Sequence, residues 1–136
     1  MSLLGSLKRM LHQTSPSFLP LETASHLNEA IAASKEAPIV LFKHSNACPI
    51  SHSAYRRVQQ LGDQSDPAVY CLTVQQSRAL SNAIADKFNI KHESPQVLLI
   101  VRGNVVYDAS HHAISVEAIR SKVSASRSDI GELNLS

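Results

Sequence analysis

A cysteine follows a short apolar segment in residues 42–51, which read FKHSNACPIS. Residues 39–43 have the apolar character of a strand, and residues 49–61 carry apolar side chains at helical spacing. Pro49 suits the first position of that helix, because its fixed φ is helical and its missing N–H has no partner to lose there. Cys48 is therefore expected to cap a helix. A thiol at such a position can act as a nucleophile in disulfide exchange.

Several groups near Cys48 are expected to stabilise its thiolate form. Ile50 and Ser51 contribute unpaired backbone amides at the helix start, and the helix dipole favours negative charge there. Lys43 and His44 precede the cysteine by a few residues and are expected to add positive potential. The alternative interpretation is a small buried hydrophobic residue that starts a helix by chance.

Ser51 stands where a dithiol redox protein carries its second cysteine. In a Cys-x-x-Cys motif the second sulfur attacks the mixed disulfide and releases the product. A hydroxyl cannot do this, although it can donate a hydrogen bond to the Cys48 thiolate. The sequence therefore predicts a monothiol mechanism, in which a separate thiol completes the cycle.

The second cysteine, Cys71, lies inside the apolar run AVYCLTV and is expected to be a buried, inert thiol rather than a resolving one. Two cysteines are too few for a disulfide framework, so a reduced, cytoplasmic setting is expected.

The seven histidines raise the question of a metal site. His44, Cys48 and His52 lie near one another in sequence, but no tetrahedral ligand spacing recurs, so no metal is expected. The pair His111-His112 is expected at the exposed end of a hairpin. Arg56 and Arg57 fall on the helix after Cys48, where a solvated helix face is the default expectation.

The composition of the chain limits its class. Its 136 residues are 43% hydrophobic and 18% charged, which fits one globular domain and not a disordered chain. A net charge of +2 without blocks of like charge gives no indication of nucleic-acid binding. Residues 1–10 (MSLLGSLKRM) have leucines at helical spacing interrupted by cations. They predict a short helix that packs on the domain rather than a signal peptide or membrane segment.

Strand and helix patterns alternate along the rest of the chain. We expect strands at 17–21, 39–43, 68–74, 96–101 and 105–108, and helices at 23–35, 49–61, 77–88 and 115–124. Gly103-Asn104 is typical of a tight hairpin turn, so the last two strands should be antiparallel. The pattern predicts an α/β domain at 17–125 with a mixed sheet in three layers, an N-terminal extension at 1–16 and a C-terminal tail at 126–136.

The wording of four segments resembles the monothiol bacilliredoxins, which are thioredoxin-like proteins of low-molecular-weight thiol metabolism. The segments are FKHS..CPIS, SNAIA, HESPQVLLI and ASH, and the resemblance covers roughly Glu22 to Ser124. It implies a thioredoxin-like fold, with a mixed central sheet and helices on both faces.

The resemblance also implies a function. Cys48 would remove bacillithiol, or a similar small thiol, from mixed disulfides on client proteins, with bacillithiol as cosubstrate and no tightly bound cofactor. Ser94-Pro95 would be a cis bond beside the thiol, and the Ser94 backbone would pair with the substrate chain like an added strand. His92 and Glu93 would border the groove.

Two other function classes fit the same layout. Monothiol glutaredoxins, which carry an iron–sulfur cluster between two subunits, also have one cysteine followed by serine at this offset. Pro49 is expected to stiffen the loop that would have to accommodate a cluster. A thioredoxin-fold binding module without turnover is the other possibility.

Overall fold

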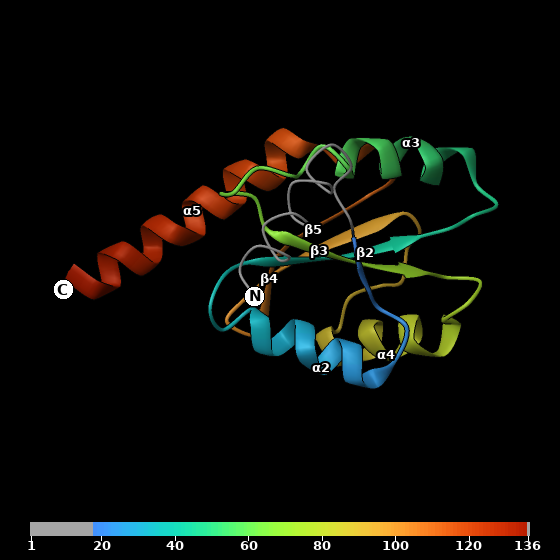
Figure 1. Cartoon of the computed structure of the whole chain (residues 1–136), viewed down its shortest axis with the longest axis horizontal. Coiled ribbons are helices and arrows are strands. Elements are labelled where there is room, and N and C mark those ends of the chain that lie inside the picture. Colours follow the sequence, from blue (N-terminus) through green and yellow to red (C-terminus); the bar gives the residue numbers. More distant parts are fainter. Residues whose placement is uncertain (1–17, 136) are drawn as a thin grey trace, which may run out of the picture.

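A five-stranded mixed sheet with the strand order β1-β3-β2-β4-β5 forms the centre of the molecule (Figure 1). The computed structural model describes residues 18–135, and their side chains as far as Arg127. The strands are β1 (Leu19–Pro20), β2 (Ile39–His44), β3 (Ala68–Thr73), β4 (Gln96–Val101) and β5 (Asn104–Ser110). The helices are α2 (Ala24–Ala33), α3 (Pro49–Val58), α4 (Arg78–Phe88) and α5 (Val116–Leu135), with a short 3-10 helix, η1 (His111–Ala113).

The central strands β2 and β4 are buried along their whole length, which explains their continuous apolar sequences. β2 runs parallel to β3 and antiparallel to β4, while β1 pairs with β3 at one edge of the sheet. Pro20 lies in that edge strand, where its missing N–H removes no interior ladder bond.

The sheet separates two apolar cores. Figure 1 shows the helices that lie on its two faces. Val40 and Phe42 of β2 contribute to the core that α3 and α5 cover. Ile39 and Leu41 alternate to the other face and pack with side chains of α2 and α4. The predicted three-layer α/β architecture is therefore confirmed.

The hairpin turn lies one residue earlier than the sequence predicted. Arg102 and Gly103 both have positive φ, of 51° and 81°, and Asn104 already pairs with Val101. Positive φ at both central positions is the requirement of a type I′ turn. Gly103 is suited to this conformation because it has no Cβ, and the Arg102 carbonyl accepts a hydrogen bond of 3.3 Å from the Asn104 side chain.

The C-terminal segment also differs from the prediction. Residues 126–135 were expected to form a tail, but they continue α5, whose end projects away from the sheet (Figure 1). The segment contains no proline, so nothing in it forces the helix to stop, although it lacks a clear apolar stripe. The helix predicted near the N-terminus, within residues 1–16, lies outside the described residues. None of the described helices combines the length and apolar character that crossing a membrane requires.

Asp66 connects α5 to the loop that follows α3. Its carboxylate accepts hydrogen bonds at 3.0 Å from the backbone N–H groups of Gly62 and Asp63. The Arg120 guanidinium donates two more, each at 2.9 Å. The hydrogen bonds from Arg120 hold the pKa of Asp66 below its usual value, although burial opposes the shift. The ionised form of Asp66 therefore stabilises the folded state.

We predict that Asp66→Asn lowers the melting temperature by a few degrees at pH 7, because the variant loses the charge that Arg120 contacts. A lowered folded-state pKa means that the stabilisation is present above the unfolded-state pKa, about 3.9, and is lost as the pH falls. Calorimetry should show a smaller difference in melting temperature between wild type and variant at pH 3 than at pH 7. Asp63→Asn, at an exposed carboxylate 3.7 Å from Arg120, is the control and should change little. Equal melting temperatures at pH 7 would contradict the assignment.

Candidate functional site

Cys48 is the N-cap residue of α3, and Pro49 is the first residue of the helix. The Cys48 backbone is extended, with φ −113° and ψ 121°, and its carbonyl accepts the first helical bond from the His52 N–H at 3.1 Å. Among the described residues the thiol has no capping hydrogen bond, and it is partly exposed to solvent. The amides of Ile50 and Ser51 belong to the first turn, whose N–H groups have no helical partner. They are thus available to an anion on the sulfur.

Ser51 is completely buried and anchors the turn that precedes Cys48. Its hydroxyl oxygen accepts a hydrogen bond of 2.9 Å from the backbone N–H of Ser45. The hydroxyl proton remains free to be donated. Ser51 therefore replaces a second thiol and also fixes the geometry of residues 45–47.

Gln75, which the sequence analysis missed, holds the same turn from the neighbouring strand. Its side-chain amide donates to the Ser45 hydroxyl at 2.7 Å and accepts from the Asn46 N–H at 3.2 Å. Gln75 follows β3, and the Cys48 turn follows β2. Because these two strands are parallel, their carboxyl ends lie at the same end of the sheet. That topology was the only sequence signal that pointed to Gln75.

His44 lies under the first turns of α3 rather than on the surface. Its ring is only 6% exposed and packs 4.8 Å from the Tyr55 ring and 5.5 Å from the His52 ring, measured between centroids. Burial lowers the pKa of His44, and His52 acts in the same direction. His44 is therefore neutral at pH 7, and Nδ1 of its ring is buried with no hydrogen-bond partner in the described part of the chain. It supplies no full positive charge to the sulfur.

Lys43 points to the opposite face of the sheet from His44. Its side chain is fully buried, and its ammonium donates to the Ser81 carbonyl of α4 at 3.0 Å. A second contact, at 3.2 Å, joins the ammonium to Nδ1 of His92. Burial lowers the pKa of Lys43 to about 8. The structure therefore pairs Lys43 with His92, and its recorded contacts do not include Cys48.

The Ser94-Pro95 loop lies at the same end of β2 as the Cys48 turn. The Ser94-Pro95 peptide bond is cis. Because Lys43 pairs with Gln96 in the antiparallel ladder, Pro95 continues that register opposite the end of β2. The Pro95 carbonyl accepts from the His111 N–H at 3.1 Å, and the Ser94 hydroxyl is buried without a partner among the described residues. The cis-proline loop and the thiol turn therefore lie at the same end of the sheet.

The remaining candidates have structural contacts. Cys71 is partly exposed, like Cys48, and not fully buried as the sequence predicted, but burial still raises the pKa of its thiol to about 12, which makes it a poor nucleophile at neutral pH. Arg57 donates to the carbonyls of Ile114 and His111 at 2.8 and 3.0 Å, so it joins α3 to η1 instead of contacting solvent alone. Glu93 lies 3.7 Å from the His111 ring. Across the described residues, no three His, Cys, Asp or Glu side chains are placed to hold one metal ion.

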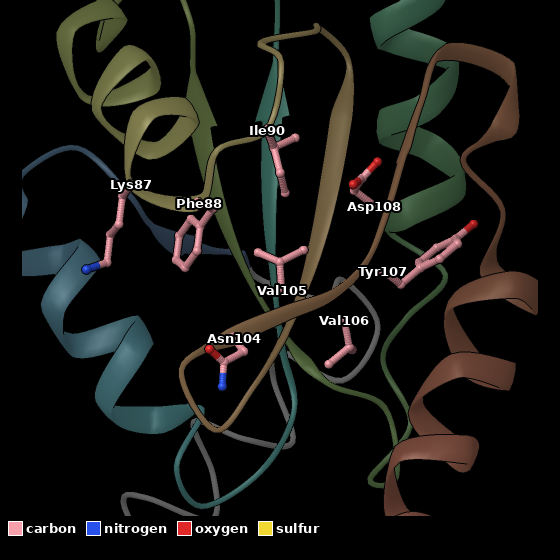
Figure 2. Close-up of a pocket in the computed structure, with 8 residues that line it drawn as sticks. All are labelled: Lys87, Phe88, Ile90, Asn104, Val105, Val106, Tyr107 and Asp108. Carbon is pink, nitrogen blue, oxygen red and sulfur yellow. The ribbon is translucent and has the colours of Figure 1, made fainter.

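A hollow of about 500 Å³ lies elsewhere, between the end of α4 and β5. Figure 2 shows Phe88 and Ile90 on one side of it and Val105 on the other. None of the predicted site residues lines it.

A strand, a turn, a cysteine at the N-cap position of a helix and a cis-proline loop at the same end of the sheet define the thioredoxin class of α/β domains, and solved structures agree. One, described as a candidate oxidoreductase with a thioredoxin fold, is 36% identical, with a TM-score of 0.69, and the match covers 76% of this chain and 90% of that one. A mutant thioredoxin from Halobacterium salinarum matches at TM-score 0.63 and 17% identity, over 82% of this chain and 92% of its own. Fasciola hepatica thioredoxin matches at TM-score 0.63 and 19% identity, over 79% and 98%. The last two likenesses show the fold alone.

The family model of the monothiol bacilliredoxin BrxC matches residues 19–119. The chain belongs to this family of thioredoxin-fold proteins, as the sequence resemblance indicated. Both findings support a redox function.

The two thiols should react at very different rates. We predict that iodoacetamide labels Cys48 at least tenfold faster than Cys71 in the reduced native protein at pH 7.5, because burial raises the pKa of Cys71 to about 12 and keeps it protonated. Mass spectrometry of digests taken over time measures both rates. Denatured protein is the control and should show similar rates at both sites. Similar rates in the native protein would contradict the assignment of Cys48 as the reactive thiol.

Proposed function

We propose that this protein is a monothiol thiol–disulfide oxidoreductase that removes bacillithiol, or a similar low-molecular-weight thiol, from mixed disulfides on client proteins. The observation that carries the proposal is the partly exposed Cys48 at the start of α3, with Ser51 in place of a second thiol. The choice of small thiol comes from the monothiol bacilliredoxin family. A reducing compartment such as the cytoplasm would keep Cys48 available for attack.

The first step is attack of the Cys48 thiolate on the small-thiol sulfur of the mixed disulfide. The client thiolate leaves and takes up a proton, and Cys48 becomes disulfide-bonded to the small thiol. The free amides of Ile50 and Ser51 support the anion before attack. The cis-proline loop supports docking of the client, because the Ser94 backbone can pair with an extended substrate chain.

The second step needs a thiol from outside the chain. Ser51 is buried and bonded to the Ser45 N–H, and its oxygen cannot form a disulfide. A second small thiol, as thiolate, would attack the adduct and release a symmetrical small-molecule disulfide together with the Cys48 thiolate. We propose no tightly bound cofactor, because the small thiols act as cosubstrates.

The reaction can be tested by mass. We expect the wild type and Cys71→Ser to acquire one small thiol when mixed with a bacillithiolated client, while the client loses it; Cys48→Ser should do neither. A parallel reaction with a glutathionylated client tests the choice of small thiol. Transfer from glutathione alone would reassign the substrate, and no transfer from either client would overturn the oxidoreductase proposal.

A second prediction concerns the monothiol character. Ser51→Cys in the Cys71→Ser background should form an intramolecular disulfide on mild oxidation, because residues 48 and 51 lie on the first turn of one helix. Non-reducing mass spectrometry should show a loss of two hydrogens per chain. The Cys71→Ser parent should give only intermolecular or small-thiol adducts. If the Ser51→Cys variant gives the same adducts as its parent, the arrangement of the two positions is wrong.

A further inference from the structure

A buried polar cluster lies behind the thiol site, on the face of the sheet that α4 covers. It contains the Lys43 ammonium, the Ser81 carbonyl and hydroxyl, and the His92 ring. The Lys43 and Ser81 side chains are fully buried. Nδ1 of His92 lies 3.2 Å from the ammonium and 3.0 Å from the Ser81 hydroxyl. Three segments that are distant in sequence thus meet at one imidazole nitrogen.

Packing alone does not explain Lys43. Within the described part of the chain, no carboxylate lies within ion-pair distance of its ammonium. A buried ammonium without a counter-charge opposes folding, and an apolar side chain of similar length would fill the space at lower cost. A lysine at this position therefore suggests a function that a methionine could not perform.

The place of the cluster in the fold suggests that function. Lys43 precedes Cys48 by five residues in the strand that leads to the thiol turn, and His92 precedes Pro95 by three residues. The contact between Lys43 and His92 therefore connects the strand that leads to Cys48 with the segment that leads to the cis-proline. Two further hydrogen bonds hold the loop that contains the cis-proline. The Gln96 side chain donates to the Lys91 carbonyl at 3.0 Å, and the Pro95 carbonyl accepts from the His111 N–H.

We propose that Lys43 and His92 are positioning residues, which hold the cis-proline loop at the distance from Cys48 that a docked client disulfide needs. The inference rests on the proposed function, since it assigns the loop to client binding. A neutral His92 with its proton on Nε2 has one lone pair on Nδ1, which the Lys43 ammonium and the Ser81 hydroxyl both approach, so this ring connects the loop to β2 and to α4. Neither residue touches the reacting sulfur in this scheme.

The contact depends on the protonation state of His92. Burial lowers the pKa of His92, and Lys43 lowers it further. A protonated ring would lose its acceptor and place two cations 3.2 Å apart, so acid should release the loop. The other titratable groups around the ring are Arg78 and Asp86 of α4 and Lys91 and Glu93 of the loop. Arg78 opposes protonation of His92, and Glu93 favours it.

Lys43→Met tests the role of the ammonium. We expect the rate of exchange with a bacillithiolated client to fall about tenfold, while the melting temperature stays equal or rises because a buried charge is removed. Iodoacetamide labelling of Cys48, which needs no docked client, should keep its wild-type rate. Lys87→Met, at an exposed lysine of α4, is the matched control. Parallel losses of stability and exchange, or an unchanged exchange rate, would overturn the proposal.

His92→Asn separates positioning from packing. The Asn carbonyl can accept in place of Nδ1 but does not titrate, so exchange at pH 7.5 should stay within about threefold of wild type. Its rate relative to Cys48 labelling should not fall between pH 7.5 and 4.5, whereas that of the wild type should, because a lowered pKa moves protonation of His92 to the acid part of this range. His92→Leu, which has no acceptor, should lose about tenfold at both pH values. Identical pH profiles of wild type and His92→Asn would contradict the scheme.

One measurement does not depend on activity. The His92 ring proton, assigned by its absence from the His92→Asn spectrum, can be followed by NMR during a pH titration. Its midpoint should rise in Lys43→Met, because a neighbouring cation has been removed. An unchanged midpoint would overturn the Lys43–His92 contact whatever the client assays give. A raised midpoint without transfer from any client would overturn only the proposed function.

Discussion

The structure of the site depends on the hydrogen bond between the Ser45 N–H and the Ser51 hydroxyl. It closes the turn between β2 and α3 and thereby places Cys48 at the helix start, where the N–H groups of the first turn have no helical partner. Gln75 supports the same turn from the end of β3. The serine is therefore part of the scaffold that orients the nucleophile, as well as the reason why the chain has no internal resolving thiol.

The sheet divides the polar groups of the site between its two faces. His44 lies on the α3 face and is neutral, whereas Lys43 lies on the α4 face and carries the charge. Neither side chain brings a full positive charge to Cys48 through a contact in the described part of the chain, so in the proposed mechanism the thiolate relies on peptide donors and the helix dipole. In the further proposal, the lysine instead positions the cis-proline loop.

Much of the fold could be predicted because its apolar patterns are strong. The continuous apolar runs of β2 and β4 indicated central strands, and Pro49 marked the helix start after Cys48. The direction of Lys43 could not be predicted, because a strand buried on both faces shows no alternation of polarity. The hydrogen bonds from Gln75 to the turn could not be predicted either. Contacts between the ends of parallel strands depend on the topology of the sheet and leave no local sequence motif.

The environment of Cys71 determines which of the two cysteines oxidation is expected to modify. Its sulfur is held in the protonated form inside the sheet, and peroxides attack thiolates far more readily than thiols. In the proposed mechanism, mild oxidation should therefore modify each chain at Cys48 and leave Cys71 unmodified. Because the Cys71 thiol stays protonated, Cys48 is the one cysteine at which oxidation is expected to change the molecule.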